Sequence, residues 1–170
     1  MLKIKQKIFG VKIFYNNDFK DFRGRYFESF NVKEFRKFSK TKFVQDDFSS
    51  SKRSVLRGFH GDGGTSKLFY CVKGKIQFAF INYDKKSKYY LKNYSLILSE
   101  NDRIQVLLPP KYGAAHLVLS KDAILHYKQS TYYGEYKQFT VSYKSPILNF
   151  KWKLKKVKVS KRDSQGLIIE

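Results

Sequence analysis

The sequence predicts an all-β protein of the sandwich or jelly-roll class. Short runs rich in β-branched and aromatic residues alternate with turns along most of the 170 residues, and many short strands with few helices are typical of two packed sheets. Aromatic residues make up 18% of the chain, so we expect a core rich in Phe and Tyr. A chain of this length is long enough for one domain with a hydrophobic core and short for two.

The expected elements follow one another in a regular order. Turn residues such as Gly61–Gly64 separate the strands. One short helix is expected near the N-terminus over Asn31–Ser39, with Asn31 as its N-cap and with Phe35 and Phe38 on one face. The expected strands are Val11–Tyr15, Phe43–Phe48, Leu68–Val72, Ile76–Asn82, Ser95–Ser99, Ile104–Leu108, His116–Leu119, Ile124–Lys128 and Gln138–Tyr143.

No Ser/Gly/Pro-rich linker and no internal repeat divides the sequence. We therefore expect one domain over residues 1–170, with its core at about residues 9–165. Towards the end, Phe150–Val159 mixes apolar and lysine positions, which indicates a segment that covers the surface of the domain. Gly166–Glu170 is expected to be a loose tail.

Composition excludes several classes of function. The formal net charge of +21 suggests nucleic-acid binding at first sight, but only seven of the 35 basic residues are arginine, and the lysines are scattered. Because base and phosphate readers gather arginine into patches, we expect no nucleic-acid partner. No apolar run reaches the roughly 20 residues of a membrane span, and Met1–Lys5 lacks a secretory pattern. We expect a cytoplasmic protein without membrane contact, in which Cys71 is a buried structural thiol.

Seven segments carry most of the residues suited to chemistry. They are, in order, Asp21–Glu28, Phe43–Ser49, Leu56–Asp62, Lys67–Cys71, Pro110–His116, His126–Lys128 and Ser160–Asp163. In this order and spacing they resemble the dTDP-4-dehydrorhamnose 3,5-epimerase family of cupin-fold sugar epimerases, over about residues 9 to 165. The resemblance implies a cupin double-stranded β-helix, a nucleotide-diphosphate sugar substrate, no cofactor, and a homodimer with exchanged N-terminal strands.

His60 is the first candidate for catalysis. Taken alone, a histidine at a strand end is more often hydrogen-bonded and inert, but the resemblance implies that His60 is the catalytic base. A neutral imidazole titrates near working pH and can remove a proton from a carbon beside a ketone. The resemblance also implies that Asp163 binds the other ring nitrogen, which fixes the tautomer and favours the charged form.

Epimerisation removes a proton from one face of the sugar and delivers one to the other. The resemblance assigns the opposite-face acid to Tyr127 and the stabilisation of the enolate oxygen to Lys67. It implies that His116 donates a hydrogen bond in the same site. His126 should face the other side of the strand from Tyr127, and we expect it to be structural.

The remaining candidates are substrate-binding residues. Arg57 and Arg23 suit a diphosphate, because a guanidinium grips it with two parallel hydrogen bonds. The resemblance implies that the segment with Arg23 and Glu28 crosses to the neighbouring subunit and meets the nucleotide base.

Three further positions are assigned to the sugar. Gln45 and Asp47 fall where the family lines the sugar pocket. Asp47 and Asp62 stand where the usual pattern has Asn and Gln, and together with Pro110–Leu119 they look more like a branch that acts on GDP-linked 4-keto-heptoses for capsule synthesis.

Several alternatives stay open from the sequence. The substrate is either that GDP-linked heptose or a dTDP-linked 4-keto-6-deoxyhexose, and the enzyme inverts C3 alone or both C3 and C5. Two other functions compete with epimerisation, namely a nucleotide-sugar 3,4-ketoisomerase and a non-catalytic cupin that binds a sugar nucleotide. A metal site of His60, Asp62 and His116 can be drawn on paper, but the resemblance implies chemistry without a metal.

Overall fold

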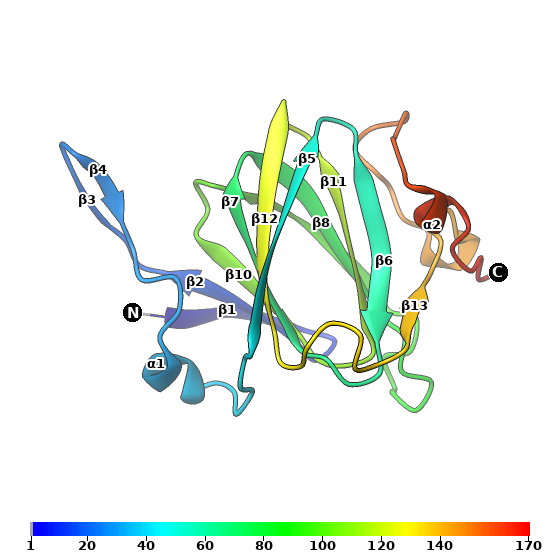
Figure 1. The fold of residues 1–170 in the computed structure, drawn as a ribbon, viewed down its shortest axis with the longest axis horizontal. Coiled ribbons are helices and arrows are strands. Elements are labelled where there is room, and N and C mark those ends of the chain that lie inside the picture. Colours follow the sequence, from blue (N-terminus) through cyan, green and yellow to red (C-terminus); the bar gives the residue numbers. More distant parts are fainter. Residues whose placement is uncertain (1) are drawn as a thin grey trace.

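The computed structural model describes residues 2–170, which form two antiparallel sheets packed face to face (Figure 1). One sheet has six strands in the order β1 (Leu2–Ile8), β2 (Val11–Asn16), β10 (Ile104–Leu108), β7 (Lys67–Lys73), β12 (Asp122–Gln129) and β5 (Gln45–Lys52). The other has five, in the order β13 (Gln138–Thr140), β6 (Leu56–Asp62), β11 (Tyr112–Val118), β8 (Lys75–Asn82) and β9 (Asn93–Ser99). From β5 to β8, successive strands alternate between the sheets. The predicted cupin jelly roll is confirmed.

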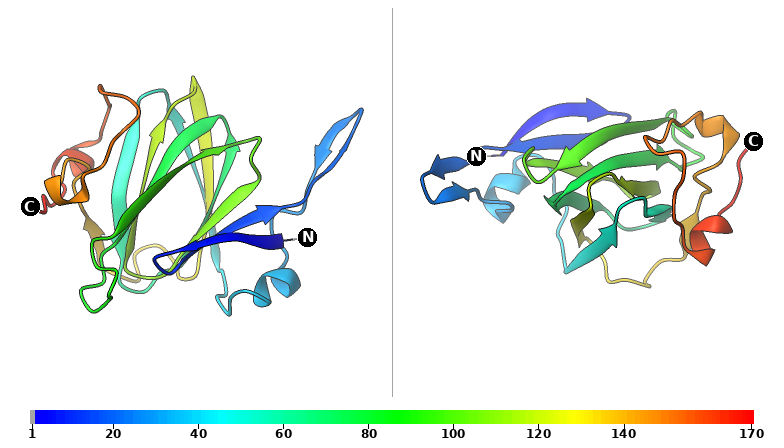
Figure 2. Two further views of the ribbon diagram at one scale, coloured as in Figure 1. Left: turned by 180° about the vertical axis from the view of Figure 1, so that it is seen from behind. Right: turned by 90° about the horizontal axis from the view of Figure 1, so that it is seen from above.

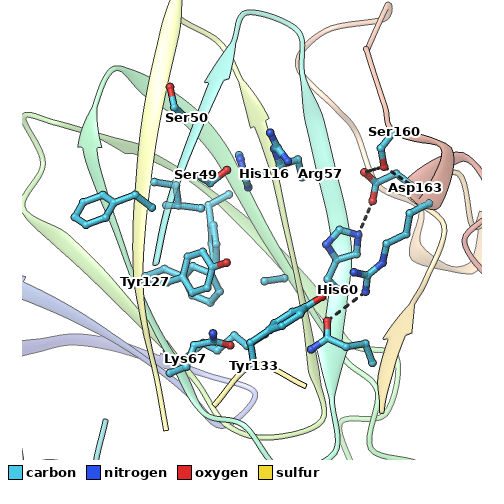
Figure 3. Close-up of a pocket in the computed structure, with 18 residues that line it drawn as sticks. Ser49, Ser50, Arg57, His60, Lys67, His116, Tyr127, Tyr133, Ser160 and Asp163 are labelled. Atoms are coloured by element: carbon cyan, nitrogen blue, oxygen red, sulfur yellow. Dashed lines mark hydrogen bonds and ion pairs between the residues drawn. The ribbon is translucent and has the colours of Figure 1, made fainter. Parts of the chain in front are cut away.

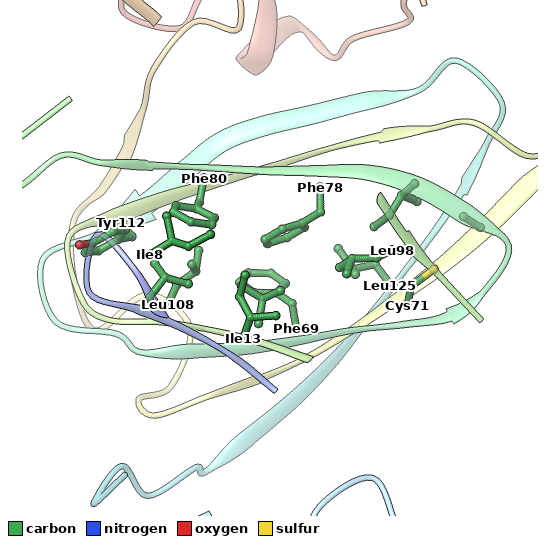
Figure 4. Packing of buried hydrophobic residues seen from close by; sticks show 14 of the residues in the cluster. Ile8, Ile13, Phe69, Cys71, Phe78, Phe80, Leu98, Leu108, Tyr112 and Leu125 are labelled. Atoms are coloured by element: carbon green, nitrogen blue, oxygen red, sulfur yellow. The ribbon is translucent and has the colours of Figure 1, made fainter. Parts of the chain in front are cut away.

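An aromatic core fills the space between the two sheets (Figure 4). Phe69 of β7 and Phe78 of β8 meet across this space, with ring centroids 4.9 Å apart. Cys71 is buried in the same cluster, and burial raises the pKa of its thiol to about 12. The prediction of a structural thiol is therefore confirmed.

The predicted helix forms as α1 (Val32–Arg36), shorter than expected. The Asn31 side chain caps it by accepting hydrogen bonds from the backbone N–H groups of Lys33, at 2.9 Å, and Glu34, at 3.3 Å. Phe35 and Phe38 both contact the ring of Phe14, so the predicted apolar face fastens the helix to β2.

A two-stranded hairpin stands away from the sheets (Figures 1 and 2). It consists of β3 (Phe19–Asp21) and β4 (Gly24–Tyr26), and its tip exposes 98% of Phe22. At its base, the carboxylate of Asp18 lies 2.9 Å from both Arg25 and Arg103. These ion pairs tie the hairpin to the end of β10.

All nine expected strand regions form strands, but the sequence did not indicate β1, β3, β4 or β6. Strand β6 contains the candidate His60. The sequence did not indicate this strand because its glycines lower strand propensity. A Cβ at Gly58 would lie 2.3 Å from the carbonyl oxygen of Ala114 on the neighbouring β11, and its φ is +112°. Only glycine fits this close approach of two backbones.

The C-terminal segment covers one edge of the five-stranded sheet. Phe150 and Trp152 pack against Phe59 with centroids 6.0 Å away, beside the short 3-10 helix η1 (Pro146–Leu148) and before α2 (Lys161–Ser164). The sequence indicates a loose tail after this point. Instead, Leu167 exchanges backbone hydrogen bonds with Thr140 and Ser142, because the extended tail adds to the free edge of β13.

No helix within residues 2–170 has the length and apolar character needed to cross a membrane.

Candidate active site

A cavity of about 560 Å³ opens between the two sheets and is lined from both of them (Figure 3). Six of the eleven predicted site residues line it, namely Arg57, His60, Lys67, His116, Tyr127 and Asp163. They come from β6, β7, β11, β12 and α2, so the fold brings together residues that lie more than 100 positions apart in the sequence.

His60 and Asp163 form a close pair at the rim of this cavity. The Nε2 atom of His60 lies 2.5 Å from Oδ1 of Asp163. The same oxygen accepts a hydrogen bond from the backbone N–H of Gly58 at 3.1 Å. Because a carboxylate accepts and does not donate, Nε2 carries the hydrogen and Nδ1 is left as the basic nitrogen.

Helix α2 holds the carboxylate of Asp163 in place. Ser160 caps the helix, and its hydroxyl accepts from the backbone N–H of Asp163 at 3.2 Å and donates to Oδ2 of Asp163 at 2.8 Å. The Asp163 side chain is 2% exposed. Burial alone would raise its pKa, but hydrogen bonds from His60, Ser160 and Gly58 outweigh burial and lower the pKa to about 2. Asp163 is therefore ionised at neutral pH.

Tyr127 enters the cavity from the other sheet (Figure 3). Its ring lies against that of Phe69, with centroids 5.3 Å apart. Burial and the nearby carboxylate of Asp47 raise its pKa, so the phenol holds its proton at neutral pH. His60 of β6 and Tyr127 of β12 thus line one cavity from the two opposing sheets.

Lys67 lies at the start of β7 and lines the same cavity as Tyr127. Burial lowers the pKa of its ammonium group, while the carboxylates of Asp62 and Asp47 act in the opposite direction. The nearest of these is Asp62, whose Oδ2 lies 3.8 Å from Nζ. Lys67 is therefore a cation partly shielded from water, which strengthens its attraction for a developing negative charge.

His116 and Arg57 lie side by side in register on β11 and β6. His116 is 7% exposed, and burial, followed by the charge of Arg57, lowers its pKa to about 4. It is a neutral ring at pH 7, suited to donating one hydrogen bond. Arg57 donates from Nε to the hydroxyl of Ser51 at 3.0 Å, which leaves the rest of its guanidinium for an anion.

The three remaining sugar candidates, Gln45, Asp47 and Asp62, do not line the cavity. Asp47 accepts hydrogen bonds from the side-chain amides of Gln45, at 2.9 and 3.0 Å, and of Gln129, at 2.6 Å. Asp62 is 3% exposed and accepts from the backbone N–H groups of Gly64 and Thr65 at 3.0 and 2.7 Å. Its carboxylate holds the turn that follows β6.

The two N-terminal candidates also lie outside the cavity lining. Arg23 stands at the tip of the hairpin and pairs with Asp21 at 2.6 Å. Glu28 accepts a hydrogen bond from Asn31 at 3.1 Å, close to the start of α1. His126 also lies outside the lining, since it faces away from Tyr127, packs on Phe48 and lies 3.7 Å from Asp46.

Some lining residues were not found from the sequence. Gln129 is two positions after Tyr127 on β12 and therefore shares its face, so strand alternation could have identified it. Tyr133 and Arg162 had no such signal, because a loop and the C-terminal helix carry them. Arg162 is held by Thr140 and Gln138, at 3.0 and 3.2 Å.

No group of three or more His, Cys, Asp or Glu side chains in residues 2–170 is arranged to hold a metal ion. Of the site drawn from the sequence, His60 binds Asp163, and Asp62 is engaged in the turn.

Comparisons with known proteins agree with the geometry. The sequence model of the family described as dTDP-4-dehydrorhamnose 3,5-epimerase matches residues 5–170. The dTDP-4-dehydrorhamnose 3,5-epimerase of Shigella flexneri is 31% identical over 168 residues, which cover 96% of this chain and 93% of that protein.

Two solved structures extend the likeness to three dimensions. One is dTDP-6-deoxy-D-glucose-3,5-epimerase from Legionella pneumophila in complex with dTDP-4-keto-L-rhamnose, with a TM-score of 0.93, 28% identity, and coverage of 99% of this chain and 93% of that one. The other is ChmJ, a 3'-monoepimerase from Streptomyces bikiniensis in complex with dTDP-quinovose, with a TM-score of 0.88, 25% identity, and coverage of 94% and 83%. The chain belongs to the dTDP-4-dehydrorhamnose 3,5-epimerase family, whose members are isomerases acting on sugar nucleotides.

Proposed function

We propose that this enzyme inverts C3 and C5 of a dTDP-linked 4-keto-6-deoxyhexose through an enolate. The observation that carries the proposal is the pairing of His60 with Asp163 on one wall of a cavity whose opposite wall presents Tyr127. The two ionisation states are those that the reaction needs, namely an ionised carboxylate behind the base and a protonated phenol facing it.

The first step is removal of a proton from the carbon beside the ketone. Nδ1 of His60 accepts this proton, and the carboxylate of Asp163 stabilises the imidazolium that forms. The ketone of the substrate makes this hydrogen acidic, so the proposed step uses only side chains of the protein. Lys67 and His116 donate hydrogen bonds to the oxygen on which the enolate charge develops.

The second step is delivery of a proton to the opposite face of the ring. Tyr127 supplies it from its hydroxyl. Solvent then restores the proton of the phenol and removes the one on His60. The diphosphate binds Arg57, and its binding energy holds the ring between the two walls.

The same proposal includes a homodimer. Arg23 and Glu28 lie outside the cavity of their own chain, on or beside a hairpin that exposes Phe19, Phe22 and Tyr26. Exposed apolar residues on a projecting hairpin are typical of a surface that a partner covers. We propose that the hairpin crosses to a second copy of the chain, where Arg23 and Glu28 meet the nucleotide.

The finer identity of the substrate also belongs to the proposal. The solved relatives named above are bound to dTDP sugars, which supports dTDP and a hexose over the GDP-linked heptose. ChmJ is a 3'-monoepimerase, so inversion at C3 alone is the second candidate. The single domain, the cytoplasmic location and the role in capsule or surface polysaccharide synthesis stay predictions.

Proton NMR in D2O tests the function. The protein is incubated separately with a dTDP-linked 4-keto-6-deoxyhexose and with a GDP-linked 4-keto-6-deoxyheptose. We expect deuterium at C3 and C5 of the hexose and none with the variant His60→Asn. Exchange of the heptose alone would reassign the substrate. A product whose carbonyl has moved to C3 would show a ketoisomerase, and binding without exchange would show a non-catalytic cupin.

A further inference from the structure

Gln129 occupies a place in the cavity that the proposed chemistry leaves unused. It lies two residues after Tyr127 on β12, so both side chains enter the cavity. In the sheet, Gln129 is paired with Lys67 of β7 on one side and with Gln45 of β5 on the other. Directly opposed side chains in a sheet have Cβ atoms about 5 Å apart. Gln129 is therefore the immediate neighbour of the cation proposed to bind the keto oxygen.

The orientation of the Gln129 amide is fixed by chemistry. Its Nε2 lies 2.6 Å from Oδ2 of Asp47, and an ionised carboxylate only accepts hydrogen bonds. The NH2 group must therefore face Asp47, and Oε1 must point elsewhere. Within residues 2–170, no hydrogen bond reaches this Oε1, although Gln129 as a whole is 2% exposed. This oxygen is not among the fully buried side-chain atoms that lack a partner, so it keeps some exposure, and Gln129 lines the cavity. The cavity therefore offers a carbonyl acceptor that a ligand hydroxyl can reach.

Asp47 fixes a second amide in the same way. Nε2 of Gln45 lies 2.9 Å from one carboxylate oxygen of Asp47 and 3.0 Å from the other. The Oε1 of Gln45 then accepts the backbone N–H of Tyr133 at 2.8 Å. With its NH2 group on Asp47 and its oxygen on Tyr133, Gln45 cannot turn to take over the donor role towards Gln129. The carboxylate thus sets the direction of both amides.

We propose that Gln129 is a substrate-binding residue that accepts a hydrogen bond from the hydroxyl on C3 of the sugar, and that Asp47 is the positioning residue that aims it. This inference rests on the proposed function. In a 4-keto-6-deoxyhexose, C5 carries only a methyl group and the ring oxygen, so the hydroxyl on C3 is the only donor on a carbon adjacent to the ketone. Lys67 then binds the ketone oxygen while Gln129 binds the hydroxyl on the neighbouring carbon. The class of ligand that fits both residues is a 3-hydroxy-4-ketose.

The test compares one pair of substrates with four proteins. The substrates are the dTDP-linked 4-keto-6-deoxyhexose and its 3-deoxy analogue. The proteins are the wild type, Gln129→Met, Asp47→Asn and the double variant with both changes. Deuterium uptake at C5 gives kcat/KM for both sugars, because both the parent sugar and its 3-deoxy analogue carry a hydrogen on C5. Dissociation constants from calorimetry give a second ratio, which is measured even if neither sugar exchanges. Each ratio is taken within one preparation, so partial misfolding of a variant cancels.

We expect the preference for the 3-hydroxy sugar to fall roughly 5- to 100-fold in Gln129→Met, the range for one buried hydrogen-bonding group left unpaired. Methionine keeps the length of the side chain but removes the acceptor. In Asp47→Asn the preference should fall in part, because an asparagine amide can also donate and lets Gln129 turn. The double variant should show no further loss if Asp47 acts through Gln129.

An unchanged preference in Gln129→Met would overturn the inference and leave the epimerase proposal intact. Conversely, wild-type protein that binds both sugars and exchanges neither would overturn the epimerase proposal, while the ratio of dissociation constants would still decide the role of Gln129. If Asp47→Asn lowers the rate for both sugars equally, Asp47 supports the fold and does not aim the amide.

Discussion

Nε2 of His60 lies 2.5 Å from Oδ1 of Asp163, although 103 positions separate the two residues in the sequence. Strand β6 supplies the histidine, and the four-residue helix α2 supplies the carboxylate. The same carboxylate binds Ser160 and the backbone of Gly58. Structure and proposed chemistry therefore depend on one ionised group, and several predictions about that group and its neighbours can be tested.

Replacing Asp163 by Asn should lower the rate far more than the stability. The amide can donate to His60 and stabilise the wrong tautomer, in which Nδ1 carries the hydrogen and cannot accept a proton. We expect a loss of about 10²- to 10⁴-fold in kcat, the scale seen when a carboxylate behind a catalytic histidine is neutralised. Deuterium exchange at C3 and C5 measures it. As a control, Ser160→Ala removes the helix cap and should cost about 1 kcal/mol of stability with a smaller change in rate.

The stability of the protein should depend on Asp163 at low pH. Its pKa is about 2 in the folded state and near the ordinary value of 3.8 when unfolded. A carboxyl group whose pKa is depressed by folding stabilises the native state above the unfolded value, and this contribution disappears as the pH falls towards 2. The difference in unfolding free energy between wild type and Asp163→Asn should shrink by roughly 2 kcal/mol from pH 6 to pH 2. Urea unfolding at several pH values checks this; a constant difference would contradict it.

Tyr127→Phe should separate proton removal from proton delivery. The variant keeps His60 and Asp163, so we expect deuterium still to enter the sugar from the face of the base, while inverted product falls about 10²- to 10³-fold. NMR distinguishes the two, because exchange without inversion leaves the couplings of the starting sugar. Tyr94→Phe is the matched control, since Tyr94 packs on Phe80 in the core and does not line the cavity. Equal loss of exchange and inversion would show that Tyr127 is needed before the enolate forms.

His116 should not set the pH dependence of the reaction between pH 5 and 8. Its pKa is lowered to about 4 by burial and by the charge of Arg57, so it is already neutral throughout this range. We expect His116→Gln to lower kcat/KM about tenfold by weakening a hydrogen bond to the enolate oxygen, with the acid limb of the pH profile unmoved. Movement of that limb by a full pH unit would instead identify His116 as the titrating group.

A mixture of two inactive variants tests the crossing hairpin. Arg23→Ala and His60→Asn are each expected to lose most activity. If Arg23 serves the partner's cavity, a mixed dimer contains one intact site, formed by His60 of one chain and Arg23 of the other. Co-refolding equal amounts should then restore about a quarter of the wild-type activity, because half of the random pairs are mixed and each has one good site. No recovery, with dimers present by sedimentation, would place Arg23 in its own chain's site or outside any site.

The sequence indicated several residues of the candidate site but not strand β6, which carries two of them. The family resemblance pointed to six residues that line the cavity, including the remote Asp163, because the order of motifs along a chain can be recognised without knowledge of its fold. Strand β6 was missed because Gly58 and Gly61 lower strand propensity. Glycine is needed at both positions because a neighbouring backbone lies too close for a Cβ atom, and the local sequence does not reveal this contact. The local structure of β6 thus depends on its packing against the neighbouring strand β11 more than on its own residue preferences.

Asp62 shows a structural role that the sequence analysis did not assign. It was assigned to the sugar because of its position in the motif, yet the residues after it are Gly63 and Gly64, a typical setting for an aspartate that caps its own turn. The carboxylate indeed accepts the N–H groups of Gly64 and Thr65. The assignment of Asp47 to the sugar pocket stays a prediction. Its link to the cavity through Gln129 depends on the pairing of β5 with β12, which the sequence alone does not give.

Helix α2 follows all the strands of both sheets in the sequence, which orders events during synthesis. His60, Tyr127 and most of both sheets leave the ribosome before Asp163, and the pairing of Leu167 with Thr140 and Ser142 closes the edge beside it only afterwards. A nascent chain can thus collapse around its aromatic core while its histidine is still unoriented. The proposed proton-transfer pair can therefore form only after both sheets have been translated.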